Sequence, residues 1–250
     1  KEPSLTFGQG EIGGLVHDPD MGRACKLQTA PDNRALKGRN HGHTTVFHFV
    51  EGLMPSKTHM HEVSRTTICI VMLNQIKGIQ VIDEDDNHVL VTVGGGENWH
   101  NLVLWSISHN LSGLQNLSLI PGSVGAAPIQ NIGAYGVEQS SCFHSLRAIS
   151  LTSGLTKLYY REDCKFGYRD SIFKKLDAGK YIITHVSYML SKEVNINVSY
   201  GAIRNELNNR KIETPTLKQI SNVICDIRVS KLPDPLVVGN AGSFFKNPIV

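Results

Sequence analysis

The sequence has little excess charge, few cysteines and no long apolar run. Its 25 basic residues against 22 acidic ones give a net charge of +3, which is too weak an imbalance to indicate nucleic-acid or membrane binding. The longest apolar run is Ile68 to Leu73, far below the ~20 residues of a membrane helix. Nothing near Lys1 has the pattern of a signal peptide. We expect an untargeted soluble protein that meets any anionic ligand through local groups.

The cysteines are also scattered, odd in number and without C-x-x-C spacing (Cys25, Cys69, Cys142, Cys164, Cys225). This usage indicates a reducing compartment, by default the cytoplasm, and neither a disulfide scaffold nor a zinc site. Histidine is concentrated in residues 1–66, where pairs such as His41 and His43, or His59 and His61, have the same-face spacing of a strand. No carboxylate or cysteine completes a metal geometry there, so we expect no metal and a poorly ordered segment without sustained periodicity.

From Ile68 onward the pattern becomes regular. It predicts a buried strand at 68–73, a hairpin of 79–82 with 88–93, a helix over about 97–109, a second hairpin of 147–151 with 156–160, and a strand at 181–190. Thr214 is predicted to cap a last helix with Pro215 at its first position, which places Arg228 and Lys231 near the helix end. This mixture predicts an α+β fold and lacks the regular alternation of a doubly wound sheet.

Small residues dominate the segment from Ile120 to Gly136. Consecutive backbone amides that no side chain shields can cradle a phosphate or diphosphate. The segment has neither a Walker nor a Rossmann glycine pattern, and a plain structural turn is an equally good interpretation of its composition alone.

Several short blocks occur together in a fixed order. They are Gly94–His100, Ile120–Gly122, Pro128–Gly136, Phe166–Ser171, Lys231–Pro235 and Asn240–Pro248. With these blocks, the chain from about Ile68 to Val250 resembles the UDP-N-acetylenolpyruvoylglucosamine reductases, also called UDP-N-acetylmuramate dehydrogenases, of bacterial cell-wall synthesis.

The resemblance implies an FAD-binding fold of the PCMH/vanillyl-alcohol-oxidase type. Residues 67–232 would form its second FAD-binding subdomain, 233–250 the start of a substrate-binding α+β domain, and 1–66 an atypical segment replacing or obscuring the first subdomain. The implied activity is reduction of UDP-N-acetylglucosamine enolpyruvate to UDP-N-acetylmuramate with FAD and NADPH, by a bacterial cytoplasmic monomer. The implied partner is this small-molecule substrate, with no nucleic acid and no membrane.

The resemblance also assigns site residues. Arg169 would stabilise charge at the substrate carboxylate, for which a guanidinium has matching paired donors, and Ser243 would donate the proton. Without the motif, Arg169 would be read as a surface ion pair with Asp170, and Ser243 as an ordinary loop serine. Substrate contacts fall on Tyr168, Tyr200, Lys231 and Asn247. Flavin contacts fall on Ile120, Pro121, Gly122, Ala126, Ile129, Gly133, Tyr135 and Arg228, with backbone amides expected to serve at Ala126 and Ala127.

Two departures leave alternatives open. The family's N-terminal Gly-Ser-Asn loop has no match in residues 1–66, and its late catalytic glutamate would fall beyond Val250, so we expect a fragment whose first residues derive from a shifted reading frame or other damage. A non-catalytic remnant of the reductase is one alternative function. Another is a serine acyl enzyme, because Ser243 and Lys246 satisfy S-x-x-K, although S-D-N and K-T-G are absent.

Overall fold

The computed structural model describes the backbone of residues 6–8, 35–40, 43–54 and 67–232, and the side chains of residues 73–232. The chain divides into two compact units, residues 1–75 and 76–250. None of the helices within the described ranges is both long and apolar enough to cross a membrane.

The first unit contains an antiparallel sheet with strand order β1-β2-β3-β4. The strands are β1 Thr6–Gly8, β2 Ala35–Asn40, β3 His43–Met54 and β4 Thr67–Asn74. The predicted strand at 68–73 is confirmed. The expectation of a poorly ordered segment is wrong for 35–40 and 43–54, because these two segments pair with each other as antiparallel strands despite their weak local pattern. His43 and His48 lie in β3, whereas His41, His59 and His61 lie outside the described residues.

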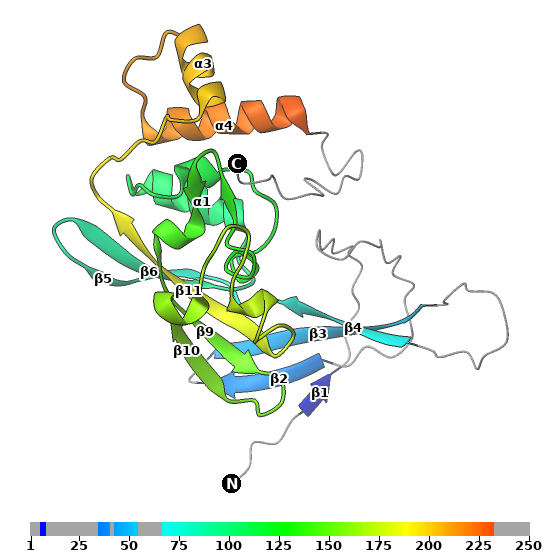
Figure 1. The fold of residues 1–250 in the computed structure, drawn as a ribbon. Coiled ribbons are helices and arrows are strands. Elements are labelled where there is room, and N and C mark those ends of the chain that lie inside the picture. Colours follow the sequence, from blue (N-terminus) through cyan, green and yellow to red (C-terminus); the bar gives the residue numbers. More distant parts are fainter. Residues whose placement is uncertain (1–5, 9–34, 41–42, 55–66, 233–250) are drawn as a thin grey trace, which may run out of the picture. The chain divides into compact units, whose positions relative to one another are not determined.

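The second unit is built on a five-stranded antiparallel sheet in the order β10-β9-β11-β6-β5 (Figure 1). Its strands are β5 Ile79–Glu84, β6 His88–Gly94, β9 Phe143–Ser150, β10 Thr156–Tyr160 and β11 Tyr181–Ser191. Both predicted hairpins and the predicted strand at 181–190 are therefore confirmed. The remaining short elements are β7 Gly133–Ala134, β8 Val137–Glu138, α2 Arg161–Cys164 and the 3-10 turns η1 Gln115–Leu117, η2 Gln139–Ser141 and η3 Ile172–Lys174.

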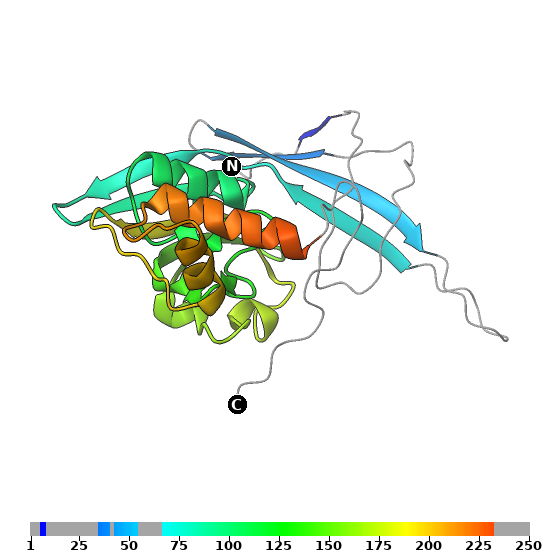
Figure 2. The ribbon, with the colours of Figure 1, turned by 90° about the horizontal axis from the view of Figure 1, so that it is seen from above.

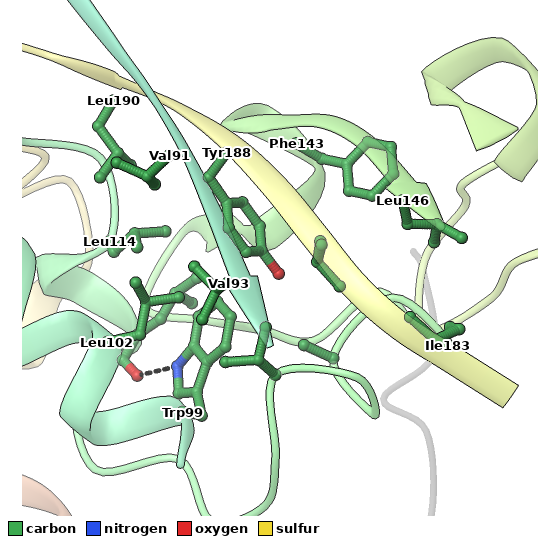
Figure 3. Close-up of a cluster of buried hydrophobic side chains, with 14 of the residues drawn as sticks. Val91, Val93, Trp99, Leu102, Leu114, Phe143, Leu146, Ile183, Tyr188 and Leu190 are labelled. Carbon is green, nitrogen blue, oxygen red and sulfur yellow. Dashed lines mark hydrogen bonds between the residues drawn. The ribbon is translucent and has the colours of Figure 1, made fainter. Parts of the chain in front are cut away.

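Helix α1, Trp99–Ser108, confirms the helix predicted over about 97–109. Asn98 caps it, since its side-chain oxygen accepts from the Asn101 amide at 3.1 Å. The inner face of α1 joins the main core: Figure 3 shows Trp99 and Leu102 facing Val93 of β6 and Tyr188 of β11. The Trp99 indole donates to the Leu117 carbonyl at 2.9 Å, so this fully buried ring also fixes the loop that follows α1.

Helices α3, Gly201–Asn209, and α4, Leu217–Lys231, pack against each other at a steep angle and share a second small core (Figures 1 and 2). The predicted cap at Thr214 is wrong, because Thr216 is the N-cap and Pro215 precedes the helix. Thr216 and Gln219 form a reciprocal capping box, with bonds of 3.2 and 2.8 Å, which satisfies more backbone donors than Thr214 could. Helix α3 was not among the predicted elements. Helices segregated from antiparallel sheets confirm the α+β class.

Candidate functional site

Residues 118–123 form a bend that we call the Leu119 corner. Leu119 has a left-handed backbone with φ of 57°. Its amide donates to His100 Nδ1 of α1 at 3.0 Å, and its carbonyl accepts from Arg228 Nε of α4 at 3.1 Å, across 109 residues of sequence. The corner therefore brings together four residues predicted for the flavin: Ile120, Pro121, Gly122 and Arg228.

The state of the His100 ring follows from this geometry. Because Nδ1 accepts from an amide, the ring is neutral and carries its proton on Nε2. Burial lowers the pKa of His100 below its usual value. The hydrogen bond from the Leu119 amide therefore requires the neutral form of His100, which the lowered pKa favours.

The Leu119 corner presents open backbone donors. Gly122 is exposed, has φ of 115°, and has no atom within 4 Å of the place where a Cβ would stand. In the part of the chain that the structure describes, no group accepts from the amides of Ile120, Gly122 or Ser123. Amides of this kind beside a guanidinium can bind a phosphate-type anion.

The amides of the two alanines that follow are hydrogen-bonded within the chain. The Ala126 amide donates to the Ser123 carbonyl at 3.1 Å and the Ala127 amide to the Val124 carbonyl at 3.3 Å. Both donors therefore have partners within the chain, and the assignment of Ala126 to the flavin site stays a prediction. The side chains of Ala126 and Ile129 are nevertheless exposed, so these two positions can offer only apolar surface.

A second bend, residues 167–171, we call the Arg169 turn. Two backbone bonds close it, from the Gly167 amide to the Asp170 carbonyl at 3.0 Å and from the Asp170 amide to the Gly167 carbonyl at 3.2 Å. Arg169 has φ of 52° and so shares the left-handed backbone of Leu119. The fully buried Ser171 hydroxyl donates to the Ile129 carbonyl at 2.5 Å and ties the turn to the small-residue segment.

The Arg169 guanidinium lies against Gly133. It donates to the Gly133 carbonyl, and a Cβ on Gly133 would stand 2.7 Å from Arg169 Nη1, closer than such atoms approach. Its other neighbour is the Tyr168 ring, 5.2 Å from the guanidinium carbon. No carboxylate among the described side chains forms an ion pair with Arg169, and Asp170 pairs with Lys175 at 2.5 Å. The simple surface pair of Arg169 with Asp170 is therefore not what forms.

Tyr135 connects the two bends, since it follows Gly133 by two residues and faces Arg228. Its ring meets Tyr200, the residue before α3, edge to face with centroids 5.2 Å apart. Burial raises the pKa of the Tyr135 hydroxyl, and the nearby Arg228 charge opposes that shift. Asn116 donates to the Tyr135 carbonyl at 3.2 Å and holds this residue in its left-handed conformation, with φ of 51°.

Most of the predicted site residues thus gather around the two bends and Tyr135. Lys231 is exposed at the last position of α4, three residues after Arg228. Ser243 and Asn247 lie outside the described residues. Sequence reasoning missed four residues that fix the site: His100, Asn116, Asn131 and Ser171. His100, Asn131 and Ser171 lie within the ordered sequence blocks that carry the family resemblance. An asparagine within a small-residue segment is a usual sign of left-handed backbone.

A family model described as an FAD binding domain matches residues 56–157. The UDP-N-acetylenolpyruvoylglucosamine reductase of Amoebophilus asiaticus is 53% identical over 175 residues, which cover 70% of this chain and 52% of that protein. The one of Flavobacterium johnsoniae is 50% identical over 182 residues, covering 72% and 54%. The matched stretch is thus similar to reductases of this family.

The family resemblance predicted from the ordered blocks is confirmed. The chain spans about half the length of the curated reductases it matches. A solved structure of the UDP-N-acetylenolpyruvylglucosamine reductase of Thermus caldophilus is 19% identical, covers 57% of this chain and 69% of that one, and has a TM-score of 0.37.

The described residues fit the FAD that the matching domain model names. Gly122 is exposed and has no atom within 4 Å of the place where a Cβ would stand, which allows a ligand to approach the backbone closely. The open amides of the Leu119 corner and the Arg228 cation suit a diphosphate. These are separate features, contributed by two segments far apart in the sequence.

Proposed function

We propose that this chain carries out, or forms part of, flavin-dependent reduction of UDP-N-acetylglucosamine enolpyruvate to UDP-N-acetylmuramate with NADPH, in peptidoglycan precursor synthesis. The observation that carries the proposal is a guanidinium, that of Arg169, held beside Gly133 without a carboxylate partner among the described side chains. A cation left without a partner and fixed in place is what a developing negative charge requires.

On the cofactor side, the open amides of Ile120 and Gly122 would bind phosphate oxygens together with Arg228. Gly133 and Tyr135 would line the flavin ring, while Pro121, Ala126 and Ile129 would supply apolar contact. When bound, FAD supplies hydride chemistry that no amino-acid side chain provides. The chain's own contribution is to bind and orient the reactants and to stabilise charge.

On the substrate side, Arg169 would hold the carboxylate of the enolpyruvyl group through two parallel N–H donors. Tyr168 would line the site, and Tyr200, Lys231 and Asn247 would bind the UDP moiety. Ser243 would give up the hydroxyl proton to the carbon left by reduction, a task for which a serine must be held close to its acceptor. A bacterial cytoplasmic setting and a monomeric state complete the proposal.

Flavin content after gentle purification is the direct test. A yellow preparation with absorbance near ~450 nm is expected from the cofactor, and a colourless chain that takes up no FAD would contradict the proposal.

Ser243→Ala then separates the steps of the reaction. It should abolish product formation while NADPH still bleaches the flavin. The control Ser153→Ala, in the exposed turn before β10, should leave both unchanged. Loss of flavin reduction and product formation together in Ser243→Ala would contradict the proton-donor role.

A further inference from the structure

Asn131 is a buried amide with every polar group engaged. It is fully buried and has a left-handed backbone with φ of 44°. Its Nδ2 donates to Glu138 Oε2 at 2.6 Å and to the Gly167 carbonyl at 3.0 Å. Its Oδ1 accepts from Gln139 Nε2 at 3.3 Å and from the Ser140 amide at 3.2 Å. A single side chain therefore links the small-residue segment to the Arg169 turn, 36 residues further along the chain.

The bond to Gly167 acts on the turn itself. The Gly167 carbonyl also accepts from the Asp170 amide at 3.2 Å, and this bond encloses Tyr168 and Arg169. Asn131 thus holds one end of the turn while Ser171 holds the other end through the Ile129 carbonyl. Because Arg169 is not glycine, its left-handed backbone conformation is strained and depends on the hydrogen bonds that Asn131 and Ser171 make.

Glu138 fixes which way the Asn131 amide points. Its carboxylate can only accept here, so the NH₂ group must face Glu138 and Gly167. Glu138 and Arg169 also both border Gly133: a Cβ on Gly133 would lie 2.9 Å from Glu138 Cγ and 2.7 Å from Arg169 Nη1. An aspartate at 131 would add a second negative charge at this place and point oxygen at oxygen.

We propose that Asn131 is a positioning residue for Arg169: its neutral amide, oriented by Glu138, holds the Gly167 carbonyl and so sets the guanidinium against Gly133. The inference rests on the proposed function, in which Arg169 meets the substrate carboxylate. A neutral donor suits this task because it fastens the turn without competing for the guanidinium charge.

The first test compares two ligands on the full FAD-loaded chain. UDP-N-acetylglucosamine enolpyruvate has the carboxylate and UDP-N-acetylglucosamine lacks it, so the ratio of their dissociation constants reports the Arg169 contact. An aspartate here carries at most one proton, which the Glu138 carboxylate would accept, so it leaves the Gly167 carbonyl without a donor. Asn131→Asp should therefore reduce this ratio by about tenfold, the size of one hydrogen bond to a charged group. Affinity for UDP-N-acetylglucosamine and for FAD should not change. The control Asn222→Asp, on the exposed face of α4, should keep the wild-type ratio.

The double variant Asn131→Asp with Glu138→Gln separates positioning from folding. The glutamine can donate to the aspartate, which restores the 131–138 bond and the charge of the pair, but the Gly167 carbonyl still faces an oxygen. Thermal stability should therefore recover while the ligand ratio stays reduced. A double variant with the wild-type ratio would overturn the inference, as would a single variant that keeps it.

Hydrogen exchange tests the same link without any ligand. In Asn131→Asp and in the double variant, the amides of Gly167 and Asp170 should exchange faster while those of β11 stay protected. Unchanged exchange at both amides would overturn the positioning role. If the wild-type chain binds neither ligand and no FAD, the proposed function itself fails, and that result is distinct from a wild-type ratio that survives in the variants.

Discussion

The Arg169 turn and the Leu119 corner are both bends with a left-handed residue, but different kinds of side chain hold them in place. Each has a non-glycine residue in the left-handed region, with φ of 52° and 57°, and each presents a cation predicted for the site. The turn is fastened by uncharged, fully buried groups, Asn131 and Ser171. The corner is fastened by a histidine and an arginine that are only partly buried.

This difference separates how the two bends should respond to mutation and to pH. A buried neutral hydrogen bond contributes at any pH, and its loss leaves partners that water cannot reach. A bond to histidine exists only while the ring nitrogen is unprotonated. The substrate side of the proposed site should therefore be the rigid one, and the flavin side the one that solution conditions can alter.

The largest expected effect is on stability. Asn131→Ala removes a fully buried side chain and its four hydrogen bonds, so the free energy of unfolding should fall by about 3–5 kcal/mol. His100→Ala removes one bond at a partly exposed position and should cost about 1 kcal/mol. Urea unfolding followed by tryptophan fluorescence measures both. Equal losses, or a larger one for His100→Ala, would remove the proposed contrast between the bends.

The next largest effect is expected on FAD affinity, with the carboxylate selectivity unchanged. Arg228→Gln removes the donor to the Leu119 carbonyl and the proposed phosphate cation, so FAD affinity should fall by roughly tenfold to a hundredfold, as for a hydrogen bond to a charged group. The carboxylate selectivity set by the Arg169 turn should persist in the flavin-loaded fraction. Arg204→Gln, exposed on α3, removes the same charge at a distance from the corner. Flavin titration of the three proteins decides the matter, and equal affinity in all three would place the phosphate elsewhere.

A smaller effect should appear as a pH dependence of stability. Burial lowers the pKa of His100 in the folded chain, so the unfolded state binds more protons and stability rises with pH across this range. The contribution is complete above the unfolded pKa of about 6.5 and is lost as pH falls below it towards the lowered value. The free energy of unfolding should change by at most about 1 kcal/mol over this range, which is the net value of one hydrogen bond.

The matched variant for this prediction is His100→Asn, whose side-chain oxygen can accept from the Leu119 amide without titrating. Denaturation at a series of pH values should show a flatter profile for His100→Asn than for the wild type. A profile that does not respond to His100→Asn would mean that the corner is not held by a titrating group.

The same contrast shows what could be predicted from sequence. Local patterns predicted α1, both hairpins of the second unit and β11, because each depends on residues close together in the chain. The cap of α4 was misplaced, since Thr214 and Thr216 both precede apolar residues and only the bonds to Gln219 distinguish them. Strands β2 and β3 escaped prediction although they pair as neighbours with Asn40 opposite His43, because neither has a sustained alternation of apolar and polar residues.

Within the site, the family blocks named the residues but not what fastens them. The Asn131 bond to Gly167 spans 36 residues and the Arg228 bond to Leu119 spans 109, and no spacing rule predicts either. The sequence also could not tell that the Ala126 and Ala127 amides are occupied, because that depends on how the segment folds back on Ser123 and Val124. Small-residue composition predicts close approach of the backbone, and only the fold decides which amides stay open.

The smallest expected effect asks whether both bends are strained. At an ordinary position Ala is more stable than Gly, but in the left-handed region the order reverses, by about 1 kcal/mol. Leu119→Gly should therefore be more stable than Leu119→Ala, and Arg169→Gly more stable than Arg169→Ala by a similar margin. Each pair removes the same side chain beyond Cβ, so the difference within a pair reports backbone strain alone. A reversal at one bend, measured by urea unfolding, would show that its left-handed conformation is not strained in the folded chain and that its fastening serves another purpose.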